Sequence, residues 1–182
     1  MLSNPFRLLP VSFAAMIGIG TSLLMLPQAT VSGRKTTILD ALFTATSAVC
    51  VTGLAVVDTA THWTGFGKAI ILFLIQVGGL GIVTVVSIGI LLVADRIGLS
   101  HTRVLAADLH TDGYGSVSKL VRNIVLTTLA FETLFAVVLS ARFFISYDYG
   151  FSTAAIHGVF HSISAWNNAG FALYTDSFIG FS

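Results

Sequence analysis

Two short stretches of this chain place one glycine among small, uncharged residues directly after an apolar segment. They consist of Val51, Thr52 and Gly53 and, later in the chain, of Asn168, Ala169 and Gly170. Backbone carbonyl oxygens of an extended stretch can replace the hydration shell of a bare potassium ion. Glycine is useful there because it tolerates backbone angles that side chains forbid. These residues form a candidate selectivity filter, although their types alone fit packing glycines in a helical bundle equally well.

A filter of this kind needs a short helix before each extended stretch, with its carboxyl end pointing at the ion. Residues 40–48 and 156–165 have the composition of such helices. The carboxyl end of a helix carries roughly half a negative elementary charge, which favours a cation at its tip. One glycine in each stretch predicts a short filter with few stacked ion sites.

The two stretches belong to an internal repeat with an offset of 117 residues. The shift pairs identical residues, namely Thr36 with Thr153, Phe43 with Phe160, Ser47 with Ser164, Ala48 with Ala165, Gly53 with Gly170 and Ala55 with Ala172. It also carries the apolar residues 8–28 onto residues 125–145. The chain is therefore predicted to use one structural unit twice, as many membrane transporters do.

Composition predicts that these units lie in a membrane. Hydrophobic residues make up 55% of the chain and charged residues only 9%, and the mean hydropathy is +0.91. A soluble domain has about 25% charged residues. Residues 8–27, 69–94 and 123–141 are each long enough to cross a bilayer, which takes about 20 helical residues. Residues 36–55 and 153–172 are too polar to span alone, so we expect re-entrant segments.

The sequence thus predicts an all-α integral membrane protein built from repeats of outer helix, re-entrant pore loop and inner helix. The first repeat covers residues 1–95, and residues 96–118 form a cytoplasmic connector. The second repeat covers residues 119–182 and is expected to be truncated before its inner helix. A formal net charge of +1 offers no basic surface for nucleic acid.

Two features inside the predicted spans have more than one interpretation. Residues 76–81, Gln-Val-Gly-Gly-Leu-Gly, fit either close helix packing through small residues or a flexible point that lines a pore. Glu132 is a functional candidate because a carboxylate in mid-membrane is costly. Its place on an outer helix favours a structural partner, or a protonated and hydrogen-bonded state, over a direct role in an ion pathway.

Other polar residues lie near the two candidate stretches. His157 and His161 share one helix face, and their spacing could hold a metal ion. The alternative function is therefore a polytopic membrane metalloprotein, but no third ligand is evident and a pore helix is favoured. Asp58 and Asp176 follow the glycines and either attract cations or cap loops. A third hypothesis is a purely structural bundle in which the glycines only pack.

Three longer motifs carry a family resemblance: residues 44–59 (TATSAVCVTGLAVVDT), 75–81 (IQVGGLG) and 164–172 (SAWNNAGFA). With them the chain resembles, over its whole length, the membrane subunits of bacterial Ktr potassium uptake systems in the Trk/Ktr/HKT superfamily. The resemblance implies four repeats around one pore, with filter glycines at Gly53 and Gly170 here. It implies potassium translocation across the bacterial plasma membrane, with no enzymatic activity and no tightly bound cofactor, potassium as substrate and sodium as co-ion.

The resemblance also implies protein partners. These are a second copy of the full-length subunit, giving a homodimer, and a cytosolic nucleotide-binding RCK ring, KtrA, through which ATP or ADP regulates transport. Residues 95–118 are then a docking surface for the ring, and the alternative is a solvated connector. The chain departs from the family by ending within the second repeat, so we expect the longer protein to be the functional one.

Overall fold

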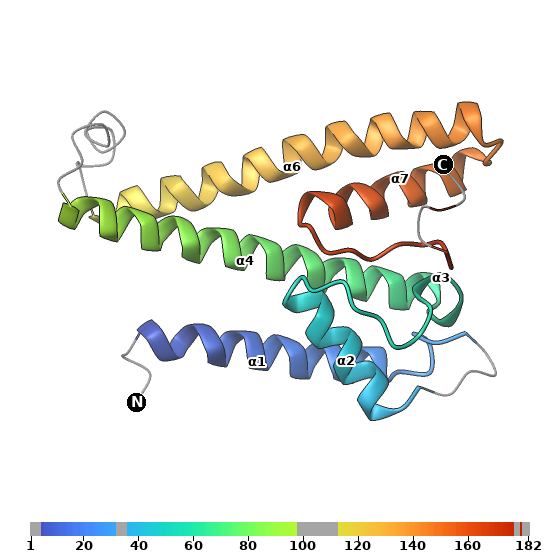
Figure 1. The fold of residues 1–182 in the computed structure, drawn as a ribbon, viewed down its shortest axis with the longest axis horizontal. Coiled ribbons are helices and arrows are strands. Elements are labelled where there is room, and N and C mark those ends of the chain that lie inside the picture. Colours follow the sequence, from blue (N-terminus) through green and yellow to red (C-terminus); the bar gives the residue numbers. More distant parts are fainter. Residues whose placement is uncertain (1–4, 32–35, 98–112, 177–178, 180–182) are drawn as a thin grey trace. The chain divides into compact units, whose positions relative to one another are not determined.

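The structure, a computed structural model, describes residues 5–31, 36–97, 113–176 and 179, and the side chains of these except for residues 5–9, 85–97 and 113–118. The helices are, in chain order, α1 (Pro5–Leu24), α2 (Ile38–Val49), α3 (Thr59–His62), α4 (Gly65–Ile97), α6 (Gly113–Ser146) and α7 (Phe151–Trp166) (Figure 1). Among the described residues, the β-type pairing is an isolated bridge between Thr30 and Trp63. The predicted all-α class is confirmed.

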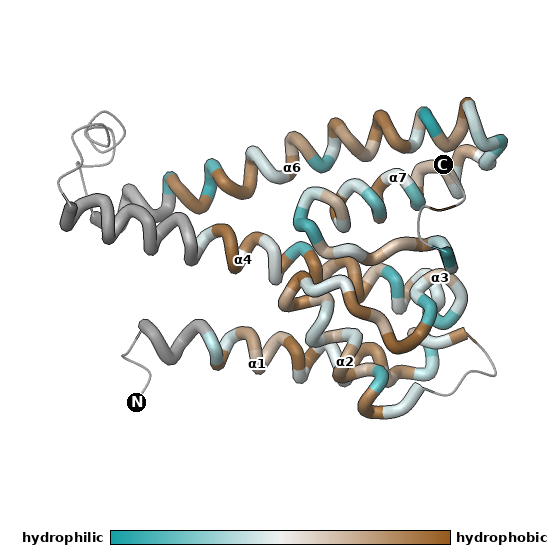
Figure 2. Tube along the Cα trace, in the orientation of Figure 1, coloured by the Kyte–Doolittle hydropathy of each residue, from teal (hydrophilic) through white to brown (hydrophobic). Residues whose placement is uncertain are grey.

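Two of the three predicted membrane-spanning stretches, residues 69–94 and 123–141, lie within α4 and α6, whereas residues 8–27 extend three residues past the end of α1, which is apolar over Pro10–Leu24. Helix α1 ends at Leu24, just before the Leu26–Pro27 pair, because proline disfavours the helical conformation of the residue before it. Gly65–Thr84 in α4 and Lys119–Ser146 in α6 are long and apolar enough to cross a membrane. Figure 2 shows hydrophobic residues along α1, α4 and α6 and more polar ones around α3.

The short helices α2 and α7 precede the two glycine-containing stretches, as predicted. Helix α2 starts at a capping box: the Thr37 hydroxyl accepts the backbone N–H of Asp40 at 3.1 Å, and the Asp40 carboxylate accepts the Thr37 N–H at 3.0 Å. The Thr37 hydroxyl and then its N–H, by donating to this carboxylate, hold the pKa of Asp40 below its ordinary value. Helix α7 starts after Gly150 without a side-chain cap.

One compact unit, Met1–Gly79 with Glu132–Ser182, contains both short helices. Helix α1 packs on α2 in this unit. The apolar core contains Leu24, Ile71, Leu74 and Trp63. Only 1% of the surface of Trp63 is exposed. Burial of such side chains contributes about 1.5–3 kcal/mol each relative to water, and here it fixes where the two short helices lie.

The connection from α1 to α2 is tied to α3 by a chain of polar contacts. The hydroxyls of Thr30 and Thr36 are 2.8 Å apart, and the Thr36 hydroxyl lies 2.9 Å from Nε2 of the buried His62. The backbone N–H of Val31 donates to the His62 carbonyl at 3.0 Å. These contacts hold the start of α2 in place.

A second unit, Leu80–Phe131, contains the remaining parts of α4 and α6. Residues 98–112, the greater part of the predicted cytoplasmic connector, lie outside the described residues. The boundaries of the predicted repeats, at residues 95 and 119, stay a prediction.

Candidate functional site

The two glycine-containing stretches leave their helices by the same hydrogen-bonded turn. After α2, the N–H of Val51 donates to the Ala48 carbonyl at 3.2 Å, and the N–H of Thr52 donates to the Ser47 carbonyl at 2.8 Å. After α7, Asn168 donates to Ala165 at 3.0 Å, and Ala169 donates to Ser164 at 2.7 Å. The donor and acceptor residues of the second turn are those of the first turn shifted by 117 residues. This pair of bonds is the Schellman motif, which normally ends a helix at a glycine.

The backbone dihedrals repeat with the same offset. The φ angles are 55° at Val51 and 77° at Gly53, against 60° at Asn168 and 73° at Gly170. Thr52 and Ala169, between them, are not among the described residues with positive φ. Asparagine tolerates the left-handed region, but a β-branched valine there is a real outlier. Val51 is therefore strained, and such strain tends to collect at functional sites.

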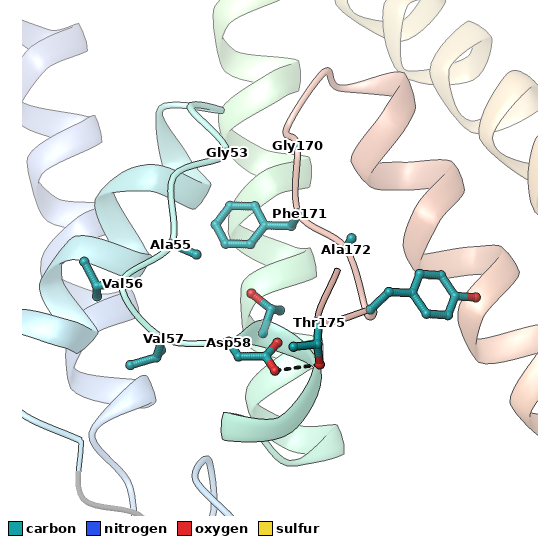
Figure 3. Close-up of a pocket in the computed structure, with 11 residues that line it drawn as sticks. Gly53, Ala55, Val56, Val57, Asp58, Gly170, Phe171, Ala172 and Thr175 are labelled. Carbon is teal, nitrogen blue, oxygen red and sulfur yellow. Dashed lines mark hydrogen bonds between the residues drawn. The ribbon is translucent and has the colours of Figure 1, made fainter. Parts of the chain in front are cut away.

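The two glycines lie against each other. A Cβ built on Gly53 would be 2.7 Å from the Ala169 carbonyl oxygen and 3.0 Å from the Cα of Gly170. A Cβ on Gly170 would lie 3.1 Å from the Cα of Gly53. Figure 3 shows the two stretches running side by side beyond this contact. The structure thus brings the two predicted stretches together, at a point where a side chain has no room.

Beyond the glycines the two stretches line a partly open cavity of about 280 Å³. It is lined by both stretches, including Ala55, Asp58, Phe171 and Thr175. The hydroxyl of Thr175 donates to the Asp58 carboxylate at 2.9 Å (Figure 3), and the same side chain accepts the N–H of Ala60 as the cap of α3. Of the two roles left open for Asp58, the structure supports capping, together with a bond between the stretches.

A partly buried polar cluster lies beside the second stretch. Asn167, the residue that caps α7, donates from its side chain to the Glu132 carboxylate and to the Ile163 carbonyl, each at 3.0 Å, and to Gln76 at 3.4 Å. Ser162 donates to the backbone carbonyl of Glu132 at 2.6 Å. Glu132, only 5% exposed, has a structural partner, as its place on an outer helix predicted.

Gly78 and Gly79 of α4 lie against the carboxyl ends of α2 and α7, directly before the two stretches. A Cβ on Gly78 would lie 2.0 Å from the carbonyl oxygen of Val49, the last residue of α2. A Cβ on Gly79 would lie 1.9 Å from the side-chain oxygen of Asn167. The structure therefore supports close packing, one of the two interpretations of these glycines.

The histidine pair is held by hydrogen bonds within the fold. His161 uses both ring nitrogens, Nδ1 toward the His157 carbonyl at 2.8 Å and Nε2 toward the N–H of Leu173 at 3.1 Å. Nδ1 of His157 lies 2.9 Å from the Tyr174 hydroxyl. Within the described residues, three His, Cys, Asp or Glu side chains do not gather as metal ligands would. A metalloprotein is not favoured.

The side chains that hold the second stretch could not be identified from the residue pattern. Ser164 donates to the Phe171 carbonyl at 2.7 Å, and Thr175 bridges to Asp58. Ser164 is the one residue of this group that the sequence marks, because the repeat pairs it with an identical residue, Ser47. The bonds of Asn167 and Thr175 join residues far apart in sequence, which no local pattern predicts.

The strain at Val51 predicts a stabilising substitution. Val51→Asn places in the first stretch the residue type found at the equivalent position of the second. We expect it to raise the free energy of unfolding by about 1 kcal/mol relative to a control, because asparagine tolerates positive φ. The control is Val56→Asn, an exposed site without positive φ. Equal thermal unfolding midpoints of the two variants in detergent would show that Val51 stores no strain.

Comparison with known proteins adds independent information. A family model described as TrkH, cation transport protein, matches residues 1–182. The chain is 40% identical over 178 residues to Ktr system potassium uptake protein B of Bacillus subtilis (strain 168), which is 98% of this chain and 39% of that protein. It is 40% identical over 175 residues to the protein of the same name from Vibrio alginolyticus, covering 96% of this chain and 38% of that one.

A third relative has a broader name. Potassium/sodium uptake protein NtpJ of Enterococcus hirae is 37% identical over 176 residues, which is 97% of this chain and 39% of that protein. The chain spans about two fifths of the length of these curated relatives.

Proposed function

The chain belongs to the TrkH family of cation transport proteins, and from this premise we propose that its two glycine-containing stretches form part of a potassium filter. Proteins of this family are plasma-membrane transporters and not enzymes. In the proposal, backbone carbonyls of Val51, Thr52 and Gly53 and of Asn168, Ala169 and Gly170 replace water around a dehydrated potassium ion.

The contact between Gly53 and Gly170 carries the proposal. When two repeats are related by a rotation, the distance between equivalent atoms grows with their distance from the axis. Gly53 and Gly170 are equivalent and touch, and Asp58 and Thr175 are equivalent and share a hydrogen bond. An axis that relates the repeats therefore runs along the two stretches and past the cavity between them. A shared axis is where a pore formed by repeats has to lie.

The dihedral pattern supports a role for backbone carbonyls. In an ordinary strand, successive residues point to opposite faces. In each stretch the first and third residues have positive φ and the middle residue does not. This arrangement breaks the alternation. Successive carbonyls are then able to turn toward one side, which a filter needs. The carboxyl ends of α2 and α7, directly before the stretches, add a partial negative charge that stabilises a cation.

Selection of potassium follows from the same geometry. An ion enters the filter only if carbonyl oxygens replace the water that it loses. Stretches fixed by hydrogen bonds to their helices hold these oxygens at a spacing that suits one ion radius better than another. The re-entrant repeat, in which outer helix, pore loop and inner helix follow each other, is part of this proposal, as are the predicted boundaries at residues 95 and 119.

We further propose that the whole protein resembles its longer relatives in assembly. Four repeats then surround one pore, two copies of the subunit form a dimer, and sodium is the co-ion. The word "system" in the names of two relatives indicates more than one component in those proteins. The proposed regulatory partner is the cytosolic RCK ring KtrA, which responds to ATP or ADP and docks on the segment around residues 96–118.

Growth on limiting potassium tests the proposed function. The full-length protein that contains this chain is produced in a bacterium that lacks its own potassium uptake. We expect growth at potassium concentrations that do not support the strain with an empty vector, together with uptake of rubidium as a potassium tracer. Failure of both, with the protein present in the membrane, would contradict the proposal.

A further inference from the structure

The two short helices carry a serine at equivalent positions, but only one of them holds its stretch. Ser47 on α2 and Ser164 on α7 are both buried, with 4% and 3% of their surfaces exposed. The Ser164 hydroxyl donates to the Phe171 carbonyl, one residue after Gly170, at 2.7 Å. The Ser47 hydroxyl is buried and has no hydrogen-bond partner among the residues that the structure describes. Two identical residues at equivalent positions therefore differ in whether they bond to the stretch that follows their helix.

The same difference appears one turn earlier on each helix. His161 on α7 accepts the N–H of Leu173 at Nε2, at 3.1 Å. Its Nδ1 faces the His157 carbonyl at 2.8 Å, so Nδ1 carries the proton and the ring is neutral. The equivalent residue on α2 is Thr44, which is 1% exposed and whose hydroxyl has no hydrogen-bond partner in the described part of the chain.

Two further contacts are made in the second repeat by residues whose equivalents in the first repeat cannot make them. Nδ1 of His157 and the Tyr174 hydroxyl are 2.9 Å apart, whereas the residue equivalent to Tyr174 is Val57, which has no hydroxyl. At the cap, Asn167 donates to Glu132. The residues equivalent to these two are Cys50 and Ala15, and alanine has no acceptor in its side chain.

We propose that the two glycine-containing stretches of this filter are anchored unequally, with Ser164 and His161 as positioning residues for the second stretch. The proposal rests on the proposed function. Ser164 fixes the carbonyl of Phe171 against the helix, so the last carbonyl of the second stretch that can face an ion is that of Gly170. The first stretch, with a strained Val51 and unused hydroxyls behind it, has a less restricted position.

The two serines provide a matched pair of variants for a test. Ser164→Ala and Ser47→Ala are made in the full-length protein, and the ratio of rubidium to sodium uptake is measured. Removing one partner of a buried hydrogen bond leaves the Phe171 carbonyl unsatisfied, so we expect Ser164→Ala to lower this ratio roughly ten-fold. Ser47→Ala removes a hydroxyl that makes no bond, and we expect a change of less than about two-fold. Ser164→Thr keeps the hydroxyl and is expected to restore most of the ratio.

Equal effects of the two alanine variants, or an unchanged ratio in Ser164→Ala, would overturn unequal anchoring. Gly170→Ser in the same assay separates this failure from failure of the proposed function. If Gly170→Ser alters the ratio and Ser164→Ala does not, the anchoring is wrong and the filter stands. If neither alters it, the filter assignment is wrong as well.

Hydrogen exchange on the unmodified full-length protein tests the same inference without any variant. The N–H of Leu173 is bonded to His161, so we expect residues 171–174 to exchange more slowly than the equivalent residues 54–57. Faster exchange in residues 171–174 would contradict the proposal even if an alanine variant failed to assemble.

Discussion

Gly170→Ser in the full-length protein is expected to abolish most of the preference for potassium over sodium while the protein still assembles in the membrane. Gly170 has a φ of 73°, and a Cβ there would lie 3.1 Å from the Cα of Gly53. A side chain in this backbone conformation costs about 1–2 kcal/mol, and relief of this strain moves the carbonyl. If the displaced carbonyl binds potassium more weakly by a similar free energy, the preference for potassium falls roughly ten-fold. Competition between sodium and rubidium for uptake measures it.

Two other glycines complete this experiment. Gly53→Ser is expected to have an effect at least as large, because its Cβ would be only 2.7 Å from the Ala169 carbonyl oxygen. Gly65→Ser is the control, since no atom of the described residues lies within 4 Å of a Cβ built there and the φ of Gly65 is not positive. Unchanged selectivity in both Gly53→Ser and Gly170→Ser, or an equal loss of selectivity in Gly65→Ser, would contradict a filter role for Gly53 and Gly170.

Gly78→Ala is expected to cause the largest loss of assembled protein among single methyl additions to α4. The added Cβ would lie 2.0 Å from the carbonyl oxygen of Val49, which is backbone and has no flexible end that can move away. Helix α2 would have to shift with the stretch that follows it. Overpacking of this kind costs about 1–3 kcal/mol or more. The amount of folded protein after detergent extraction, measured by size-exclusion chromatography, tests this expectation.

Gly18→Ala on α1 is the matched control. Within the described ranges, no atom lies within 4 Å of a Cβ built on Gly18, so alanine gains helix propensity there without a clash. We expect stability there to rise by about 1 kcal/mol at most, the difference between glycine and alanine in a helix. If both variants were equally stable, the close approach of α2 to Gly78 would not matter for the fold.

Most of the secondary structure around the candidate site could be predicted from the sequence. The predicted helix at residues 40–48 lies within α2, and that at residues 156–165 lies within α7. Apolar length predicted the long helices, but their ends were wrong by several residues, because helix ends depend on caps and prolines more than on hydropathy. At α2 the signal was present, since the spacing of Thr37 and Asp40 is that of a capping box.

The backbone of the site could be predicted only in part. Glycine at positions 53 and 170 indicated unusual dihedrals, and both have positive φ. Val51 gave no such signal, because valine favours extended conformations and normally excludes positive φ. Its conformation follows from the Schellman bonds to α2 and from the contact between the two stretches, neither of which residue types reveal.

The side-chain partners required the structure. Glu132 was expected to find a structural partner, but nothing in the sequence identified Asn167, since these residues meet through the packing of α6 on α7. The repeat pairs Ser47 with Ser164, yet the two hydroxyls make different contacts in the structure. Identity within a repeat therefore does not establish identical contacts, because the surrounding residues differ between the two copies.

Anomalous diffraction from crystals of the full-length protein, grown with rubidium or thallium in place of potassium, can show whether the two glycine-containing stretches hold a cation. We expect a peak beside Gly53 and Gly170 within coordination distance of backbone carbonyl oxygens of both stretches, and its loss when sodium replaces the heavier ion. A cation held only by side-chain carboxylates such as Asp58, with no density beside the two glycines, would contradict the account.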